Sequence, residues 1–140
     1  MVVNMNNRYI LILLAVLLIL PAVNAADFSV SIEPVKDSIY ITESALFNVT
    51  ITNEGSTTET YKLSSDATWD LMSDPLPDYY SGMKISPNGS KSTILKFSPP
   101  TKVSTGAKRL NLNVESEQEQ KITLPITIYI KATGYSPQGY

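Results

Sequence analysis

Residues 47–64, FNVTITNEGSTTETYKLS, decide the fold class. Apolar side chains alternate with polar ones on both sides of the turn formers at positions 53–55: Phe47, Val49, Ile51, Tyr61 and Leu63. A period of two residues places one face of a strand in a core and the other in water, the pattern of antiparallel two-layer structures. Asparagine and glycine at positions 53–55 are typical of a turn. The stretch therefore predicts two strands, and Tyr61 is the candidate to fill the centre of a sandwich.

Four more runs have the same period: residues 27–34, 93–100, 109–116 and 121–132. No segment after residue 25 has the 3.6-residue period of a helix. Six clear strands and one or two weaker ones match an immunoglobulin-like domain. We therefore predict an all-β chain with an immunoglobulin-like antiparallel β-sandwich of about seven strands over residues 26–132. Pro125 has no N–H for the ladder, so we expect it at a sheet edge or where its strand changes partner.

The first 25 residues, MVVNMNNRYILILLAVLLILPAVNA, have the layout of a secretory signal peptide. A polar start with Arg8 precedes an apolar run over residues 9–20, and Pro21 separates that run from the short side chains ending at Ala25. The run is shorter than the roughly 20 residues that cross a bilayer core. We expect a signal-peptide helix, cleavage after Ala25, and an extracytoplasmic protein that is secreted or associated with the cell envelope. The alternative is an uncleaved segment that anchors the chain. Residues 133–140 predict a tail or the start of a linker.

The composition excludes several kinds of chemistry. The chain has no cysteine and no histidine, so a nucleophilic triad cannot form and zinc or copper sites are not expected. The formal charge of −2 and the lack of a basic stripe give no reason to expect nucleic acid as a partner. We expect no cofactor and no catalysis. A hydrolase built on two carboxylates is the enzymatic alternative, but no acid is marked by the sequence as buried.

Residues 66–85, DATWDLMSDPLPDYYSGMKI, are the one stretch that suggests a site. Aspartates recur at every fourth position: Asp66, Asp70, Asp74 and Asp78. That spacing would align them on one helix face, but Pro75 and Pro77 exclude a helix after Asp74. We predict instead a short strand over residues 68–72 and a loop over residues 73–82.

Three hypotheses for this segment follow from its residue types. Aromatic rings beside acids can form a binding lip for a sugar ring or a protein partner, and the candidates are Trp69, Asp70, Asp74, Asp78, Tyr79 and Tyr80. Asp74 and Asp78, with Ser81, are the candidates for a calcium loop, although the EF-hand spacing is absent and we assign no metal site. The third hypothesis is a solvated connection in which Trp69 alternates into the core.

Two tripeptides fit the N-glycosylation pattern, and they begin at Asn48 and Asn88. Asn48 lies on the polar face of its strand if Phe47 and Val49 point inward. Asn88 falls in a predicted turn, so we expect its side chain to be exposed.

Three stretches carry a family resemblance: FNVTITNEGSTTETYKLS (47–64), ISPNGSKSTILKFSPP (85–100) and GAKRLNLNV (106–114). They resemble the small immunoglobulin-like modules of bacterial and archaeal envelope proteins, the CARDB-like and related β-sandwich repeats. In those modules a V-x-I-x-N-x-G strand end, a Pro-x-Gly turn and a strand closed by proline follow one another, here at residues 49–55, 87–89 and 99–100.

The resemblance covers residues 28–132 and implies an extracytoplasmic, non-catalytic module for adhesion, spacing or assembly. Its expected partners are envelope or secreted proteins. The alternative from a different class is a carbohydrate-binding module that uses the aromatic and acidic residues of 66–82, with a glycan as partner. Membrane contact is expected only through residues 1–25, if they are not cleaved.

Overall fold

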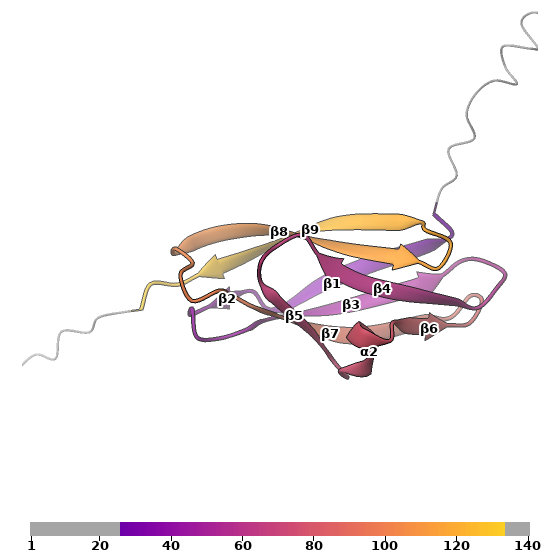
Figure 1. Cartoon of the computed structure of the whole chain (residues 1–140), viewed down its shortest axis with the longest axis horizontal. Helices are drawn as coiled ribbons and strands as arrows, with labels where there is room; N and C mark the ends of the chain where they lie inside the picture. Colours follow the sequence, from indigo (N-terminus) through magenta and orange to yellow (C-terminus); the bar gives the residue numbers. More distant parts are fainter. Residues whose placement is uncertain (1–25, 134–140) are drawn as a thin grey trace, which may run out of the picture.

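The computed structural model describes residues 26–133, which form two β-sheets packed face to face (Figure 1). The expected signal peptide, residues 1–25, and the expected tail beyond Thr133 lie outside the described residues. Sheet A has the strand order β1-β3-β7-β5, with the bounds β1 (Phe28–Lys36), β3 (Ala45–Asn53), β7 (Ser90–Ser98) and β5 (Asp70–Asp74). Sheet B has the order β2-β9-β8-β4-β6, with the bounds β2 (Ser38–Ile39), β9 (Lys121–Ile130), β8 (Gly106–Ser116), β4 (Glu59–Ser65) and β6 (Met83–Ile85). One short helix, α2 (Pro77–Tyr80), joins β5 to β6.

The core forms where the alternating side chains of the two sheets meet. Every second residue of β3 is buried, and Phe47 meets Phe97 of β7 edge-on, with 5.8 Å between ring centroids. Tyr61 of β4 is 1% exposed, and its ring lies 4.9 Å from that of Phe28, as the alternation predicts. Burial of a large apolar side chain contributes about 1.5–3 kcal/mol. The residues of the core cluster lie between positions 28 and 130. Residues 26–133 therefore contain the whole of this core and both sheets.

The strand pairing confirms the predicted antiparallel sandwich, with one short exception. β2 runs parallel to β9 and pairs with it only at Tyr129 and Ile130. Pro125 lies opposite Asn111 of β8, in a stretch of β9 whose other side has no partner strand among the described residues. This is the edge position that its missing N–H requires. The strands of five or more residues number seven in the described part, and β2 and β6 are shorter additions.

Three local predictions differ from the structure. The strand expected over residues 68–72 runs from Asp70 to Asp74. A helix forms after Asp74, against prediction, because Pro77 lies in its first turn, where the missing N–H would have no intrahelical partner anyway. β2 and β6 were not predicted, because two or three residues are too few to show a period. In the described part of the chain, α2 is far too short to cross a membrane, and no other helix is long and apolar enough.

Candidate functional site

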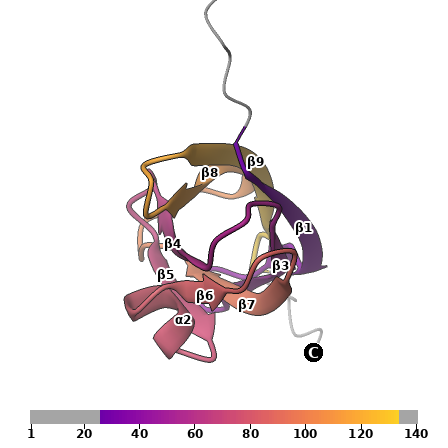
Figure 2. The ribbon, with the colours of Figure 1, turned by 90° about the vertical axis from the view of Figure 1, so that its right-hand side faces the viewer.

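The segment that the sequence singles out, residues 66–85, crosses between the two sheets twice. It leaves sheet B after β4, forms β5 at the edge of sheet A, and returns through α2 to β6 at the edge of sheet B. α2 contacts both β5 and β4 and lies on the outside of the sandwich near β5 and β6 (Figure 2). The helix therefore bridges the two sheets along one side of the domain.

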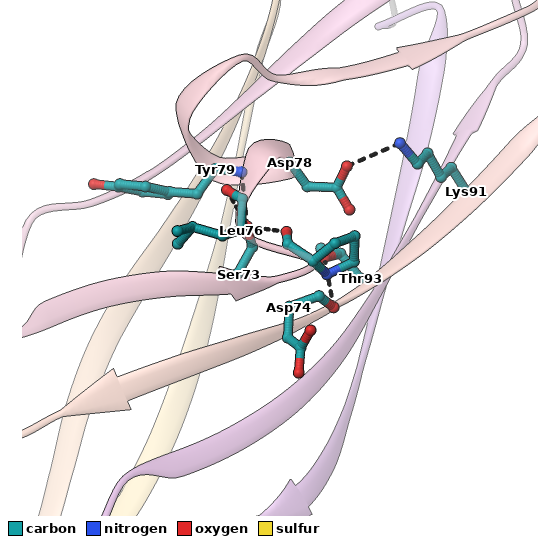
Figure 3. A network of polar contacts seen from close by, with 8 residues as sticks. Ser73, Asp74, Leu76, Asp78, Tyr79, Lys91 and Thr93 are labelled. Atoms are coloured by element: carbon teal, nitrogen blue, oxygen red, sulfur yellow. Dashed lines mark hydrogen bonds and ion pairs between the residues drawn. The ribbon is translucent and has the colours of Figure 1, made fainter.

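Ser73 fastens the turn that leads into α2 (Figure 3). Its buried hydroxyl shares its proton between the carbonyl oxygens of Pro75, at 2.7 Å, and Leu76, at 3.1 Å. The same oxygen accepts a hydrogen bond of 2.7 Å from the N–H of Tyr79. One side chain of β5 thus bonds three backbone groups of the turn, and it adds to the longer backbone hydrogen bonds from Asp78 to Pro75 (3.3 Å) and from Tyr79 to Leu76 (3.2 Å).

Asp78 is the buried acid of this segment, with 4% of the residue exposed. Its Oδ1 accepts a hydrogen bond of 2.8 Å from Nζ of Lys91 in β7, and its Oδ2 is buried without a hydrogen-bond partner among the described residues. Figure 3 shows this pair on the opposite side of the turn from Tyr79. The sequence marks no acid as buried, and the structure shows that Asp78 is one. Asp78 pairs with Lys91 of β7, which is 13 residues further along the chain. The residues around Asp78 therefore do not predict that its carboxylate is buried.

The first two aspartates have no part in the α2 turn. Asp66 accepts hydrogen bonds from the side-chain amides of Asn113, at 2.6 Å, and Asn111, at 3.5 Å, both in β8. Asp70 is exposed at the first position of β5. The equal spacing of the four aspartates therefore does not place them on a common face.

The two acids considered as calcium ligands have different partners. Oδ2 of the exposed Asp74 lies 3.9 Å from Nζ of Lys96, whereas Asp78 turns inward to Lys91. Within residues 26–133, no three acidic side chains gather as potential metal ligands. Calcium takes six to eight oxygen ligands, and the geometry here is that of two separate ion pairs.

The three aromatic rings of the candidate lip do not lie in one plane. Trp69 is 9% exposed and belongs to the core, which is its place in the solvated-connection hypothesis. Tyr79 is half-buried against the core, and Tyr80 is 69% exposed. The rings of Tyr79 and Tyr80 lie 5.4 Å apart with their planes at 72°. A flat lip for a sugar needs coplanar exposed rings, and this segment offers mainly the ring of Tyr80.

Two exposed apolar side chains near α2 were missed by the sequence analysis: Met72, 48% exposed, and Leu76, 47% exposed. Leu76 is the N-cap residue of α2 with helical backbone angles, and Tyr80 follows four residues later, the spacing that places side chains on one helix face. We call Leu76 and Tyr80 the α2 ridge. Met72 lies on the outer face of sheet A opposite Lys96. The four-residue spacing of Leu76 and Tyr80 can be read from the sequence. It predicts a shared face only if the segment is helical, and the sequence analysis excluded a helix there.

Both potential glycosylation sites have accessible side chains. Asn48 is half-exposed on the outer face of β3, because its neighbours Phe47 and Val49 point into the core. Asn88 is exposed in the turn between β6 and β7, where its φ of 58° is in the left-handed region that asparagine tolerates. The attachment of glycans at either position stays a prediction.

The sequence matches no family model and no curated protein. Solved structures, in contrast, share the arrangement of the sheets. A FixG-related protein from Vibrio parahaemolyticus aligns with 77% of this chain and 100% of its own, with a TM-score of 0.60 and 10% identity. The chain is an immunoglobulin-like β-sandwich.

A second similar structure is part of a longer chain. A family 123 glycoside hydrolase from Clostridium perfringens aligns over 27% of its own length and 75% of this immunoglobulin-like chain, with a TM-score of 0.57 and 12% identity. Identities this low show the fold alone, and one fold serves many unrelated functions. The function of the immunoglobulin-like domain must therefore be argued from its own surface.

Proposed function

We propose that the chain is an exported, non-catalytic immunoglobulin-like module of the CARDB-like kind, which binds a protein partner in the cell envelope through the α2 ridge. The observation that carries the proposal is the exposure of Leu76, the N-cap residue of α2, and of Tyr80, its last residue, at the four-residue spacing of one helix face. Tyrosine is enriched among the residues that dominate binding energy at protein interfaces. An exposed leucine beside it adds apolar area that a partner can remove from water.

The inner side of α2 supports this role because it is firmly held. Ser73 closes the preceding turn, and Asp78 pairs with Lys91 of β7. A contact surface that is already ordered loses less conformational entropy on binding than a flexible loop does. The backbone that carries the α2 ridge is therefore held in place before a partner binds.

Export and the absence of catalysis rest on the sequence. Residues 1–25 have the signal-peptide layout, and the chain has no histidine or cysteine for a nucleophilic site. A module of this kind serves adhesion, spacing or assembly. Within residues 66–82, a glycan partner would have to rely mainly on the exposed ring of Tyr80, so the protein partner is the stronger candidate for this segment.

The test is a pull-down from solubilised envelope with residues 26–140 as bait. The matched variants are Leu76→Ser with Tyr80→Ser, which removes the α2 ridge, and Val35→Ser, which removes an exposed apolar side chain of β1. We expect one protein to be retained by the native bait and the Val35 control but lost from the double variant. With that protein purified, its dissociation constant should rise about 30-fold in the double variant, which corresponds to about 2 kcal/mol. Equal retention by all three baits would refute the assignment, and elution of glycan alone would favour the carbohydrate-binding alternative.

A further inference from the structure

A recess of about 260 Å³ lies at the end of the sandwich where β1 begins, at the right-hand end in Figure 1. Its walls come from the start of β1, the β3–β4 loop, the first residues of β4 and the turn between β8 and β9. The lining includes Asp27, Phe28, Glu59, Tyr61, Ser116 and Gln118. A water molecule takes up about 30 Å³ in the liquid, so the recess has room for the end of a long side chain.

The walls of the recess are held by side-chain hydrogen bonds. Asn53 is fully buried, donates to the carbonyl oxygen of Thr57 at 2.8 Å, and accepts from the N–H of Gly55 at 3.0 Å. The side-chain oxygen of Gln120 accepts a hydrogen bond of 2.9 Å from the N–H of Asp27. The first contacts order the β3–β4 loop, and the second joins β1 to the β8–β9 turn. The recess is therefore a built feature of the fold.

The charge of the recess is negative. Asp27 and Glu59 line it, and within the described residues no lysine or arginine does. Burial raises the pKa of the Tyr61 hydroxyl above its usual value, and the charges of Glu59 and Asp27 raise it further. Further acids line the adjoining hollow together with Lys62: Glu115, Glu117 and Glu119. A positively charged ligand would be attracted to this end of the domain.

Glu59 is only half satisfied by the protein. Its Oε1 accepts a hydrogen bond of 2.7 Å from Nε2 of Gln118. Its Oε2 is buried and has no hydrogen-bond partner in the described part of the chain. A buried carboxylate oxygen without a donor costs free energy. This oxygen has almost no accessible surface, so the Glu59 side chain must turn towards the recess to accept N–H groups from a positively charged ligand, which would remove that cost.

The floor of the recess is aromatic. The rings of Phe28 and Tyr61 lie 4.9 Å apart and are tilted by 49°, and both residues line the recess. Aromatic faces attract ammonium and guanidinium groups, and the methylene stem of such a group packs well on an apolar surface. Phe28 is 3% and Tyr61 1% exposed, so the recess combines a small aromatic surface at its base with acidic side chains in its lining.

We propose that this recess binds an alkylammonium or guanidinium group, with Glu59 as the principal acceptor and Asp27 as the second charge. The side chains of lysine and arginine in a polypeptide carry such groups, and so do free amines. A divalent metal ion fits less well, because the described residues hold no cluster of three acids while calcium takes six to eight oxygens. The recess is distinct from the α2 ridge, so this proposal does not rest on the proposed function.

The test is an NMR titration of isotope-labelled residues 26–140 with matched probes. Butylamine and butylguanidine carry the charge, butanol is the neutral control, and calcium chloride tests the metal. We expect the two cations to shift the backbone amide of Gly55 and the side-chain amide of Gln118, and butanol to leave them unchanged. Glu59→Gln should weaken the binding of both cations at least tenfold. Asp70→Asn, at an exposed acid of β5, should not change it.

A second pair of probes distinguishes a lysine side chain of a polypeptide from a free amine as the natural ligand. An acetylated tripeptide amide with a central lysine is compared with butylamine: tighter binding of the peptide assigns the recess to a polypeptide partner, and equal binding assigns it to free amines. The thermal melting of each variant shows that it is folded. The proposal is overturned if butanol shifts the same amides as butylamine, if folded Glu59→Gln binds the cations as well as the native chain, or if calcium alone produces a response.

Discussion

Nζ of Lys91 lies 2.8 Å from the carboxylate of Asp78, and this contact joins strand β7 to helix α2. The two ends of the contact differ in environment, because the side chain of Lys91 is 43% exposed and that of Asp78 only 5%. The lysine can therefore keep part of its hydration while it neutralises a carboxylate that has lost nearly all of its own. The contact holds the inner side of α2 while the α2 ridge faces solvent.

Loss of the lysine should destabilise the domain more than loss of the whole pair. Lys91→Met leaves the buried carboxylate of Asp78 without its donor, and we expect the free energy of unfolding to fall by about 1–3 kcal/mol. The double variant Lys91→Met with Asp78→Asn should recover part of that loss, because no buried charge remains. Urea unfolding of the native chain, the two single variants and the double variant gives the coupling energy. Additive effects of the two substitutions would contradict the account.

Removal of the Ser73 hydroxyl should loosen α2 without unfolding the sandwich. Ser73→Ala removes the shorter of the two acceptors of the Tyr79 N–H and leaves only the carbonyl oxygen of Leu76 at 3.2 Å, so we expect a cost of about 1 kcal/mol. We expect hydrogen exchange at the amide of Tyr79 to become faster, with exchange in β3 changed much less. Ser29→Ala, at an exposed position of β1, is the control. Unchanged protection of the Tyr79 amide in Ser73→Ala would show that the hydroxyl does not hold the turn.

Tyr61 should make the stability of the domain sensitive to alkaline pH. Burial, and then the charges of Glu59 and Asp27, raise the pKa of its hydroxyl in the folded state. A raised folded pKa gives stability that is complete below the unfolded pKa, about 10 for tyrosine, and is lost as the pH rises through the folded pKa. Thermal melting between about pH 9 and pH 12 should therefore fall more steeply for the native chain than for Tyr61→Phe. Parallel curves for the two proteins would contradict the pKa shift.

Trp69 should report a buried indole. Because only 9% of the residue is exposed, we expect its fluorescence to be blue-shifted relative to indole in water, weakly quenched by acrylamide, and red-shifted on unfolding in urea. The chain has a single tryptophan, so the signal needs no variant for its assignment. Emission typical of exposed indole in the folded protein would restore the aromatic lip that the sequence suggests.

Alternating hydrophobicity is a local property, and it predicts the local outcomes well. The burial of Phe47, Val49 and Ile51, the central place of Tyr61 and the edge position of Pro125 all follow from residue spacing and the chemistry of proline. The same spacing accounts for the two-layer architecture, because each strand offers only one apolar face. These features depend on the residue and its nearest neighbours in the chain.

The candidate sites depend on contacts between distant segments, and the sequence does not predict them. Asp78 is buried because β7 brings Lys91 to it, and α2 forms because its first turn tolerates a proline that would disrupt a helix interior. Glu59 and Asp27 are 32 positions apart, and they line one recess only because the start of β1 in sheet A faces β4 in sheet B. No periodicity marks either acid.

The central claim, that the α2 ridge is an interaction surface, is tested most directly by cross-linking in the envelope itself. A photoreactive phenylalanine derivative replaces Tyr80 in one version of the full chain and Val35 in another, because both positions are highly exposed. We expect illumination to join position 80 to one envelope protein and to leave position 35 without that product. The same product from both positions, or no protein product from position 80, would contradict the account.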